Sequence, residues 1–437
     1  MKEQKTKHRY STEAHLIYGL TQDPHWDYSH HVLPPISGSA TFRLDSAQRG
    51  AQAFTEFAHT YDGNTVTSQA PIYVYDRLGE PNKDMLEENL AFAEQGDIAV
   101  TFASGMAAVS AVLGILTGTG SEIIAHRTLY GCTYSLLENW YPRLGIRVKF
   151  IDLSSPDELR EALTEQTRVI YCETPVNPTL RLIDLKAIAE IAAEANARRD
   201  PGERLFSVVD NTFATPYCQR PIQNGIDFVV HSLTKAIGGF GTDIGGAVIG
   251  PRWSHDRLLL YRKDFGGVLS PRSAWSVLVQ GLPSLGVRMR QMQLTALTVA
   301  KALAARPEIE CVQYPGLDSF PQVELARRQM IDYDGNFAPG SMLYFVMRGK
   351  TPEGGLHKAE RFINHVAQNS YCVTLAVSLG NIRTLIEHPG SMTHSAIPPA
   401  EQVAKGLNPG GIRLSIGLER PEDIIRDLEA SLNAVGT

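Results

Sequence analysis

The chain has 437 residues, of which 43% are hydrophobic and 20% are charged, and its formal net charge is -6. This length exceeds one small core and indicates two or three packed domains, with the composition of an ordinary soluble globular protein. The mild negative charge and the lack of a basic run leave nucleic-acid binding without support.

Cysteine spacing and apolar patterning argue against further classes. The five cysteines are scattered and include no C-x-x-C pair, so we expect neither a metal site nor a disulfide framework. The charged N-terminus lacks the apolar region of a signal peptide, and no run of about 18 apolar residues predicts a membrane span. We therefore expect a cytoplasmic protein with no membrane or metal partner.

The first 70 residues show little regular pattern. They begin rich in aromatic residues and histidine, continue through Leu-Pro-Pro-Ile, and contain a polar loop at residues 62–68. Such a segment is poorly suited to folding alone. We expect residues 1–75 to form an arm that packs on another subunit.

From about residue 83 the pattern alternates between helix and strand. Helical spacing is found at 83–95, 105–116, 156–163 and 185–197, and short β-branched runs at 98–102, 122–125, 148–153, 168–172, 205–209, 228–230 and 247–249. This alternation is typical of a largely parallel sheet covered on both faces. We assign residues 76–275 to this α/β domain.

After about residue 270 the pattern changes again. Helical spacing is found at 286–305, 357–367 and 421–434, and strand-like runs at 341–347 and 413–416. The last helix opens with Pro-Glu-Asp, which is typical of a helix N-terminus. We expect a smaller α+β domain over residues 276–437.

Lys235 gives the strongest chemical signal in the chain. It follows the apolar strand 228–230, and the hydroxyls of Ser232 and Thr234 flank it before a pair of glycines. Hydroxyls and backbone amides can bind phosphate oxygens, and a lysine amine can hold an aldehyde as a Schiff base. The pattern predicts a site for pyridoxal phosphate (PLP), although most lysines are merely solvated.

Two other segments could complete this site. Asp210 ends the strand 205–209, where its carboxylate could keep the pyridine nitrogen of PLP protonated or could simply cap the next turn. Ser-Gly opens the helix 105–116, so the free amides of Gly105 and Met106 could bind the phosphate. Each segment alone is a weak signal for a PLP site. Together with Lys235 the two segments support the prediction that the protein binds PLP.

A set of short motifs lies in order along nearly the whole chain. They are Pro34-Pro35-Ile, Tyr75-Asp-Arg77, Ala103-Ser-Gly-Met106, Leu129-Tyr-Gly-Cys132, Glu173-Thr-Pro-Val-Asn177-Pro, Asp210-Asn-Thr-Phe-Ala-Thr-Pro, Val230-His-Ser-Leu-Thr-Lys235-Ala-Ile-Gly-Gly, Ser378-Leu-Gly, His388-Pro-Gly-Ser-Met-Thr-His394 and Arg413-Leu-Ser-Ile-Gly-Leu-Glu419. The set resembles the Cys/Met-metabolism PLP enzymes, which include cystathionine γ-synthase, cystathionine lyase and methionine γ-lyase. The resemblance implies the aspartate-aminotransferase-like fold (PLP fold type I) and a homotetramer of dimers with shared active sites.

The resemblance also implies a role for each matching residue. Lys235 would carry PLP, Asp210 would pair with the ring nitrogen and Asn177 would contact the ring hydroxyl. The phosphate would be held by Gly105, Met106, Ser232 and Thr234, and by Tyr75 and Arg77 from the neighbouring subunit.

The remaining implied roles concern the substrate. Tyr130 would stack on the ring and act as an acid. Arg413, with the Ser378 segment, would bind the substrate carboxylate, a task that suits a planar guanidinium. A surface ion pair is the alternative for Arg413.

Three positions suggest which reaction the enzyme performs. Val377 stands where cystathionine-using relatives tend to carry Glu, and an apolar side chain offers nothing to a distal ammonium. Cys132 is similar to the pocket cysteine of methionine γ-lyases, although a free cysteine is often just a small buried hydrophobe. Ser-Met-Thr-His at 391–394 also resembles the lyases. We expect a γ-elimination that gives 2-oxobutanoate, ammonia and the γ-leaving group.

Two departures from the family pattern concern the entrance of the site. Glu80 and Asp76 would add negative charge there and could favour a cationic leaving group such as the oxyguanidine of canavanine, unless Glu80 merely caps a turn. The loop at 61–70 also looks long. Cystathionine cleavage and γ-replacement, as in O-acetylhomoserine sulfhydrylase or cystathionine γ-synthase, stay open because the same residues serve them. A non-enzymatic PLP-binding protein is disfavoured because the main catalytic residues are present.

Overall fold

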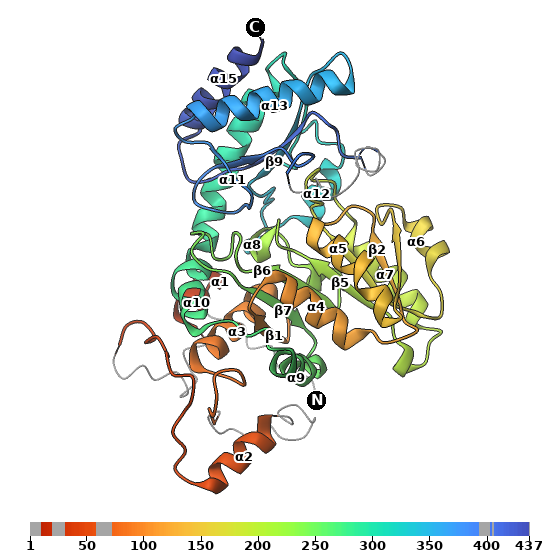
Figure 1. Ribbon diagram of the computed structural model, residues 1–437, viewed down its shortest axis with the longest axis vertical. Coiled ribbons are helices and arrows are strands. Elements are labelled where there is room, and N and C mark those ends of the chain that lie inside the picture. The colour runs from red at the N-terminus through yellow and green to blue at the C-terminus, as the bar shows by residue number, and fades with distance from the viewer. Residues whose placement is uncertain (1–9, 20–30, 58–71, 393–402, 404–405, 437) are drawn as a thin grey trace.

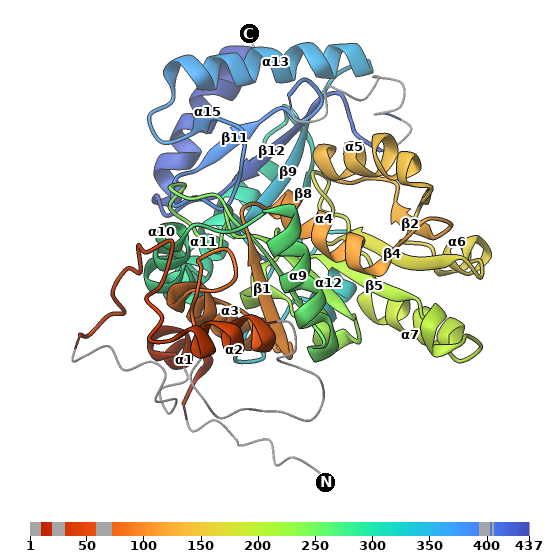
Figure 2. The same cartoon turned by 60° about the horizontal axis from the view of Figure 1, so that its bottom comes forward.

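The computed structural model describes residues 10–19, 31–57, 72–392, 403 and 406–436. Two sheets form the body of the molecule, and the long helix α11 (Leu282–Ala304) runs from the larger sheet to the smaller one (Figure 1). Figure 2 shows the C-terminal part with α13 (Pro352–Asn369) and α15 (Pro421–Gly436) on the outer side of the smaller sheet. The functional residues described below lie between the two parts.

The larger sheet has seven strands. They are β1 (Ile98–Phe102), β2 (Glu122–His126), β3 (Arg147–Ile151), β4 (Thr167–Glu173), β5 (Phe206–Asp210), β6 (Phe228–Ser232) and β7 (Gly246–Gly250). Their order is β1-β7-β6-β5-β4-β2-β3, and only β7 runs antiparallel to its neighbours. The predicted α/β architecture is confirmed, with strand ends within two residues of those expected.

Helices cover both faces of this sheet because successive residues of a strand point to opposite sides. They are α3 (Pro81–Glu94), α4 (Gly105–Leu116), α5 (Gly131–Asn139), α6 (Pro156–Ala162), α7 (Leu185–Asn196), α8 (Thr215–Cys218), α9 (His255–Phe265) and α10 (Pro271–Ser276). On β2, Ile123 and Ala125 pack in the core with α4, α5 and α9. Ile124 packs on the other face, with α6 and α7.

The smaller sheet has five strands in the order β10-β11-β12-β9-β8. They are β8 (Ile309–Gln313), β9 (Met342–Met347), β10 (Thr374–Leu375), β11 (Leu385–Glu387) and β12 (Gly411–Ser415), with α12 (Val323–Gln329) preceding β9. One face packs against α11, α13 and α15. The other face includes Tyr344 and Met342, which pack on Leu180 of the larger part. The predicted α+β character is confirmed, and the long helix begins four residues earlier than expected, after a π-helical segment Val277–Gly281.

The N-terminal arm is more regular than its sequence suggested. It contains α1 (Thr12–Tyr18) and α2 (Ala47–Phe57). Leu16 of α1 is buried and packs in the core with α3 and α11, so this part of the arm binds its own chain. Helix α2 stands away from the sheets (Figure 1). Contact of the arm with another subunit and the domain bounds at 75/76 and 275/276 stay predictions, and the loop at 61–70 lies outside the described residues.

Glu80 and Asp76 do not form an acidic rim, so that expectation is wrong. Glu80 is completely buried at the N-cap of α3, where its carboxylate accepts hydrogen bonds from the amides of Asn82 (2.9 Å) and Lys83 (2.7 Å). Asp76 forms a salt bridge of 2.8 Å with the buried Lys83 ammonium. Both charges serve the fold, so the turn-capping alternative is the correct one and a cationic leaving group loses its support.

Replacement of this cap should cost stability without changing substrate choice. We expect Glu80→Ala to destabilise the protein by about 0.5–2 kcal/mol, the usual loss for an N-cap residue, and to lower the thermal unfolding midpoint. Glu80→Gln keeps one acceptor oxygen and should lose less. Identical midpoints for Glu80→Ala and the wild type, or an altered substrate preference, would contradict the capping role.

The helices and the His, Cys, Asp and Glu side chains of the described ranges bear on membrane and metal partners. None of the helices there combines the length and apolar character that crossing a bilayer requires. No three His, Cys, Asp or Glu side chains in the same ranges converge as a metal site would need.

Candidate functional site

The candidate site lies at the carboxyl ends of three neighbouring parallel strands. Glu173 ends β4 and Asp210 ends β5, and the two residues are direct partners in the strand register. Strand β6 ends at Ser232, and Lys235 follows in the next turn. Open α/β sheets bind ligands at this edge, so the fold places the predicted residues where a ligand is expected.

Lys235 is held in a tight turn and points to the smaller domain. Its ammonium donates a hydrogen bond of 2.8 Å to the hydroxyl of Ser378. Its carbonyl accepts from the amide of Gly239 (2.8 Å). Burial, followed by the positive charge of Arg413, lowers the pKa of Lys235 from its usual range. A lowered pKa makes the neutral amine more available, as a nucleophile or base requires.

The segment around Ser378 has unusual backbone geometry. Ser378 has a φ of 98°, a region that side-chain-bearing residues rarely adopt. Its hydroxyl accepts from Lys235, and its carbonyl accepts from Arg413 at 2.8 Å. A Cβ on Gly380 would lie 2.3 Å from the amide nitrogen of Ala236, so this turn approaches the lysine turn closely. Such strained positions cluster at ligand sites.

Asp210 offers a carboxylate suited to a cationic ring nitrogen. Its hydrogen-bond partner is Thr212, whose amide donates at 2.9 Å, and no Lys, Arg or His in the described ranges forms an ion pair with it. Burial raises the pKa of Asp210, and burial together with Asp210 raises that of the neighbouring Glu173. A protonated pyridine nitrogen would place an opposite charge in direct contact with this carboxylate, so the residue fits PLP.

The N-terminus of α4 approaches the end of β6 closely enough to share one ligand group. The hydroxyl of Ser104 caps the helix at the amide of Ala107 (3.1 Å). A Cβ on Gly105 would lie 3.0 Å from the Cβ and 3.2 Å from the hydroxyl of Ser232, so only glycine permits this approach comfortably. Helix amides beside a hydroxyl form a suitable phosphate site, which again fits PLP.

The other two expected phosphate ligands have partners within the protein. The hydroxyl of Thr234 accepts from the amide of Gly245 at 3.1 Å. The sulfur of Met106 accepts from the hydroxyl of Thr133 at 3.7 Å. Met106 could therefore offer its amide rather than its side chain.

Tyr130 and Cys132 lie together at the start of α5. The amide of Tyr130 donates to Glu173 (2.7 Å), and the sulfur of Cys132 is 3.4 Å from the Tyr130 hydroxyl. Burial, followed by the contact with Cys132, raises the pKa of Tyr130 to about 12. The phenol is thus protonated at neutral pH and can donate a proton. The residue is 39% exposed, so a ligand can reach it.

Arg413 is buried at the centre of the site. Its guanidinium donates to the side-chain oxygen of Asn177 (3.0 Å) and to the carbonyl of Ser378. It also forms an ion pair of 3.0 Å with Glu387, its register partner on β11, and the two side chains are only 3% and 1% exposed. The surface alternative for Arg413 is wrong, since it contacts two of the other predicted residues.

Tyr75 and Arg77 lie apart from the other predicted residues. Arg77 donates to the carbonyl of Lys263 (2.8 Å), and its guanidinium lies 5.5 Å from the centre of the Tyr75 ring. Both are exposed, and these contacts differ from that of Lys235, whose ammonium donates to Ser378. Their expected role toward a neighbouring subunit stays a prediction.

Sequence reasoning missed three residues of the site. Thr212 and Glu173 gave usable signals, because one lies two residues after Asp210 and the other ends the neighbouring strand. Glu387 gave no such signal. Its pairing with Arg413 depends on the register of two strands that are far apart in the sequence.

Comparison with known proteins adds to this geometry. The family model for the Cys/Met metabolism PLP-dependent enzymes matches residues 16–433. The chain is 39% identical to an L-methionine gamma-lyase of Fusobacterium nucleatum subsp. polymorphum over 92% of this chain and 93% of the relative. It is 34% identical to the O-acetyl-L-homoserine sulfhydrylase of Leptospira meyeri over 83% and 86% of the two chains.

A solved structure is similar along almost its full length. The cystathionine gamma-lyase of Lactobacillus plantarum, complexed with L-serine, superimposes with a TM-score of 0.82 and 30% identity, over 98% of this chain and 100% of that one. These similarities confirm the expected fold class and PLP as the cofactor.

Proposed function

We propose that this chain, which belongs to the Cys/Met metabolism PLP-dependent enzyme family, is a γ-lyase for a methionine-like amino acid. The products would be 2-oxobutanoate, ammonia and a thiol. The observation that supports this most directly is Val377, an apolar side chain that is 58% exposed beside Ser378. An apolar wall suits a thioether and would leave a second ammonium without a partner.

Cofactor and substrate would be held by opposite sides of the site. The Asp210 carboxylate would pair with the ring nitrogen, and Gly105 and Ser232 would bind the phosphate. Arg413 would bind the substrate carboxylate with its planar fork, oriented by Asn177 and the Ser378 carbonyl. PLP, when bound, supplies the electron sink that stabilises negative charge at the substrate Cα.

Two side chains would move the protons. Lys235 would take the proton from Cα, since burial and Arg413 favour its neutral amine, and a second proton would leave Cβ before the γ-substituent departs. Tyr130 would give a proton to the departing sulfur, because its raised pKa keeps the hydroxyl protonated. Cys132, in contact with that hydroxyl, would line the pocket beside the leaving group.

The assembly proposed for the enzyme is a homotetramer of dimers with shared sites. Arg77 is an exposed cation whose described partners are a carbonyl and the Tyr75 ring, with no carboxylate among them. A phosphate of the neighbouring subunit would suit it. Light scattering of the holoenzyme should give the mass of a tetramer, and a monomer would contradict the shared site.

The substrate assignment is tested with a panel on the purified holoenzyme. Methionine, homocysteine, cystathionine, canavanine and O-acetylhomoserine with sulfide are each incubated while 2-oxobutanoate, thiol and homocysteine are measured. We expect methionine to give 2-oxobutanoate and thiol in equal amounts. Replacement of the leaving group by sulfide, with little 2-oxo acid, would instead support γ-replacement, the activity in the name of the Leptospira relative.

Two variants show whether Val377 selects the substrate. Val377→Glu would add a carboxylate for a distal ammonium, so it should raise cystathionine turnover relative to methionine turnover. Val377→Ile keeps the apolar wall and is the matched control. An unchanged preference in Val377→Glu would remove the main support for a thioether substrate.

A further inference from the structure

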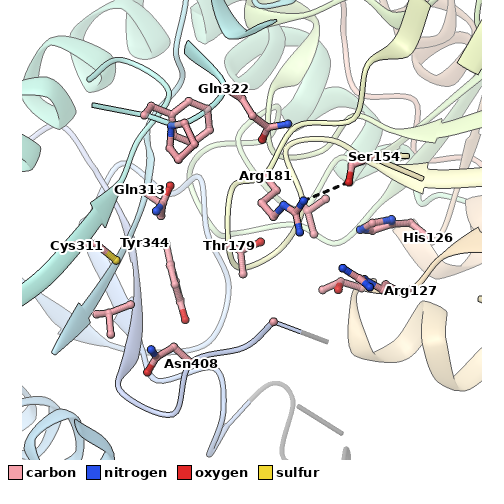
Figure 3. Close-up of a pocket in the computed structure, with 16 residues that line it drawn as sticks. His126, Arg127, Ser154, Thr179, Arg181, Cys311, Gln313, Gln322, Tyr344 and Asn408 are labelled. Atoms are coloured by element: carbon pink, nitrogen blue, oxygen red, sulfur yellow. Dashed lines mark hydrogen bonds between the residues drawn. The ribbon is translucent and has the colours of Figure 1, made fainter. Parts of the chain in front are cut away.

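A cavity of about 460 Å³ lies between the two parts of the molecule. Its walls come from the ends of β2 and β3, from the segment around Thr179 and Arg181, and from β8 and β9 of the smaller sheet (Figure 3). This volume lies within the range of about 300–1,000 Å³ that small-molecule sites occupy. Lys235, Asp210 and Arg413 do not line it, so it is separate from the proposed active site.

His126 presents a hydrogen-bond donor in this cavity. Its side chain is only 6% exposed, and its Nδ1 accepts from the amide of Leu153 at 3.1 Å. Burial lowers the pKa of His126 to about 4, so the ring is neutral and its proton resides on Nε2. Within the described ranges no residue accepts a hydrogen bond from that nitrogen.

Two arginines add positive charge beside this donor. Arg127 and Arg181 line the cavity, and both approach the carboxylate of Asp152, at 2.6 and 4.0 Å. Arg181 also donates to the hydroxyl of Ser154 (3.2 Å), as the dashed line in Figure 3 shows. One carboxylate shared by two guanidinium groups leaves one positive charge uncompensated, which suits a monoanion better than a dianion.

The remaining lining has a different character. Val176, Phe320 and Val346 are apolar, and Gln313 and Asn408 lie across the cavity from the arginines (Figure 3). A ligand with an anionic head and a short apolar body would satisfy both ends. Because its walls belong to both parts of the chain, such a ligand would touch both.

We propose that this cavity binds a small monocarboxylate, whose carboxylate is held by Arg127, Arg181 and the Nε2–H of His126. A carboxylate matches a guanidinium through two parallel hydrogen bonds and can accept a further one from the imidazole. Val176 immediately precedes Asn177, which orients Arg413, so the occupied cavity adjoins the active site without sharing its ligands.

The test measures binding of sodium butanoate to the PLP-loaded enzyme by saturation-transfer NMR. Arg181→Gln removes one charge from a half-exposed position. His126→Asn keeps an acceptor for Leu153 and removes the Nε2 donor. We expect saturable binding that each variant weakens at least about tenfold, the scale of a lost charged hydrogen bond. Arg160→Gln, a surface arginine of similar exposure outside the cavity, should bind like the wild type.

Several results would overturn the proposal. Butanoate binding that does not saturate would exclude this cavity as a specific binding site. Binding that Arg181→Gln and His126→Asn leave unchanged would exclude it as well. Loss of binding in Arg413→Lys but not in Arg181→Gln would place butanoate in the active site. Inorganic phosphate that binds more tightly than butanoate at the same ionic strength would refute the monocarboxylate assignment. If His126→Asn unfolds, Arg181→Gln decides the outcome alone.

Discussion

Lys235→Ala is expected to abolish turnover with every substrate of the panel while leaving the fold intact. Lys235 follows the end of β6, and its amine donates a hydrogen bond to Ser378. Burial and the positive charge of Arg413 lower its pKa, which favours the neutral amine that can take a proton. Loss of a proton-transferring group alone costs about 10²–10⁴ in rate. If Lys235 carries PLP as proposed, loss of that covalent attachment would add to the effect. Steady-state kinetics and the thermal unfolding midpoint measure the two effects separately.

Two further variants show which property of the lysine matters. Lys235→Arg keeps the positive charge, but its guanidinium is always protonated and cannot act as a base, so it should be as inactive as Lys235→Ala. Lys186→Ala is the matched control, since it removes an exposed lysine paired with Glu190 on α7. Retained methionine cleavage by Lys235→Ala would overturn the proposed mechanism.

The sheet and its helices could be predicted from the sequence because local patterns agree with the tertiary structure. Helix α4 begins and ends at the expected residues, since Ser104 is an N-cap and an apolar segment follows. The arm was harder to predict. Helix α2 contains Gly50, which weakens helix propensity, and α1 is short and depends on burial of Leu16.

In the candidate site, too, local patterns predicted some residues, whereas others depend on tertiary contacts. Residues at strand ends could be predicted, because parallel neighbours must bring Glu173 and Asp210 to one edge. For Glu80 the sequence left an acidic rim and a turn cap both open, because an acidic residue before a helix has the same sequence signature whether it is buried or exposed. Its burial depends on contacts that the spacing does not show. Glu387 could not be predicted, since it meets Arg413 only through strand register.

The ion pair between Arg413 and Glu387 gives the second large expected effect. Arg413→Met should abolish productive substrate binding and also destabilise the protein by about 3–5 kcal/mol, because the buried Glu387 carboxylate then loses the positive charge of Arg413. Kinetics with methionine and thermal unfolding measure both losses. If unfolding were unaffected, Glu387 would not depend on Arg413 for its burial.

The double variant separates stability from function. Arg413→Met with Glu387→Gln removes both charges, so most of the lost stability should return while activity stays absent. The single variant Glu387→Gln is the more informative case. Arg413 would keep its neutral acceptors on Asn177 and Ser378 but lose its counter-ion, so its full charge becomes available to the substrate carboxylate.

Glu387→Gln should therefore lower the KM for methionine and be less stable than the wild type until a carboxylate ligand binds. The reason is that the substrate carboxylate competes with Glu387 for one guanidinium, and removal of the internal competitor favours the external one. Unfolding midpoints measured with and without a substrate analogue should converge as the analogue saturates. A higher KM in Glu387→Gln would show instead that the carboxylate positions Arg413 for the substrate and that its charge is needed in the bound state.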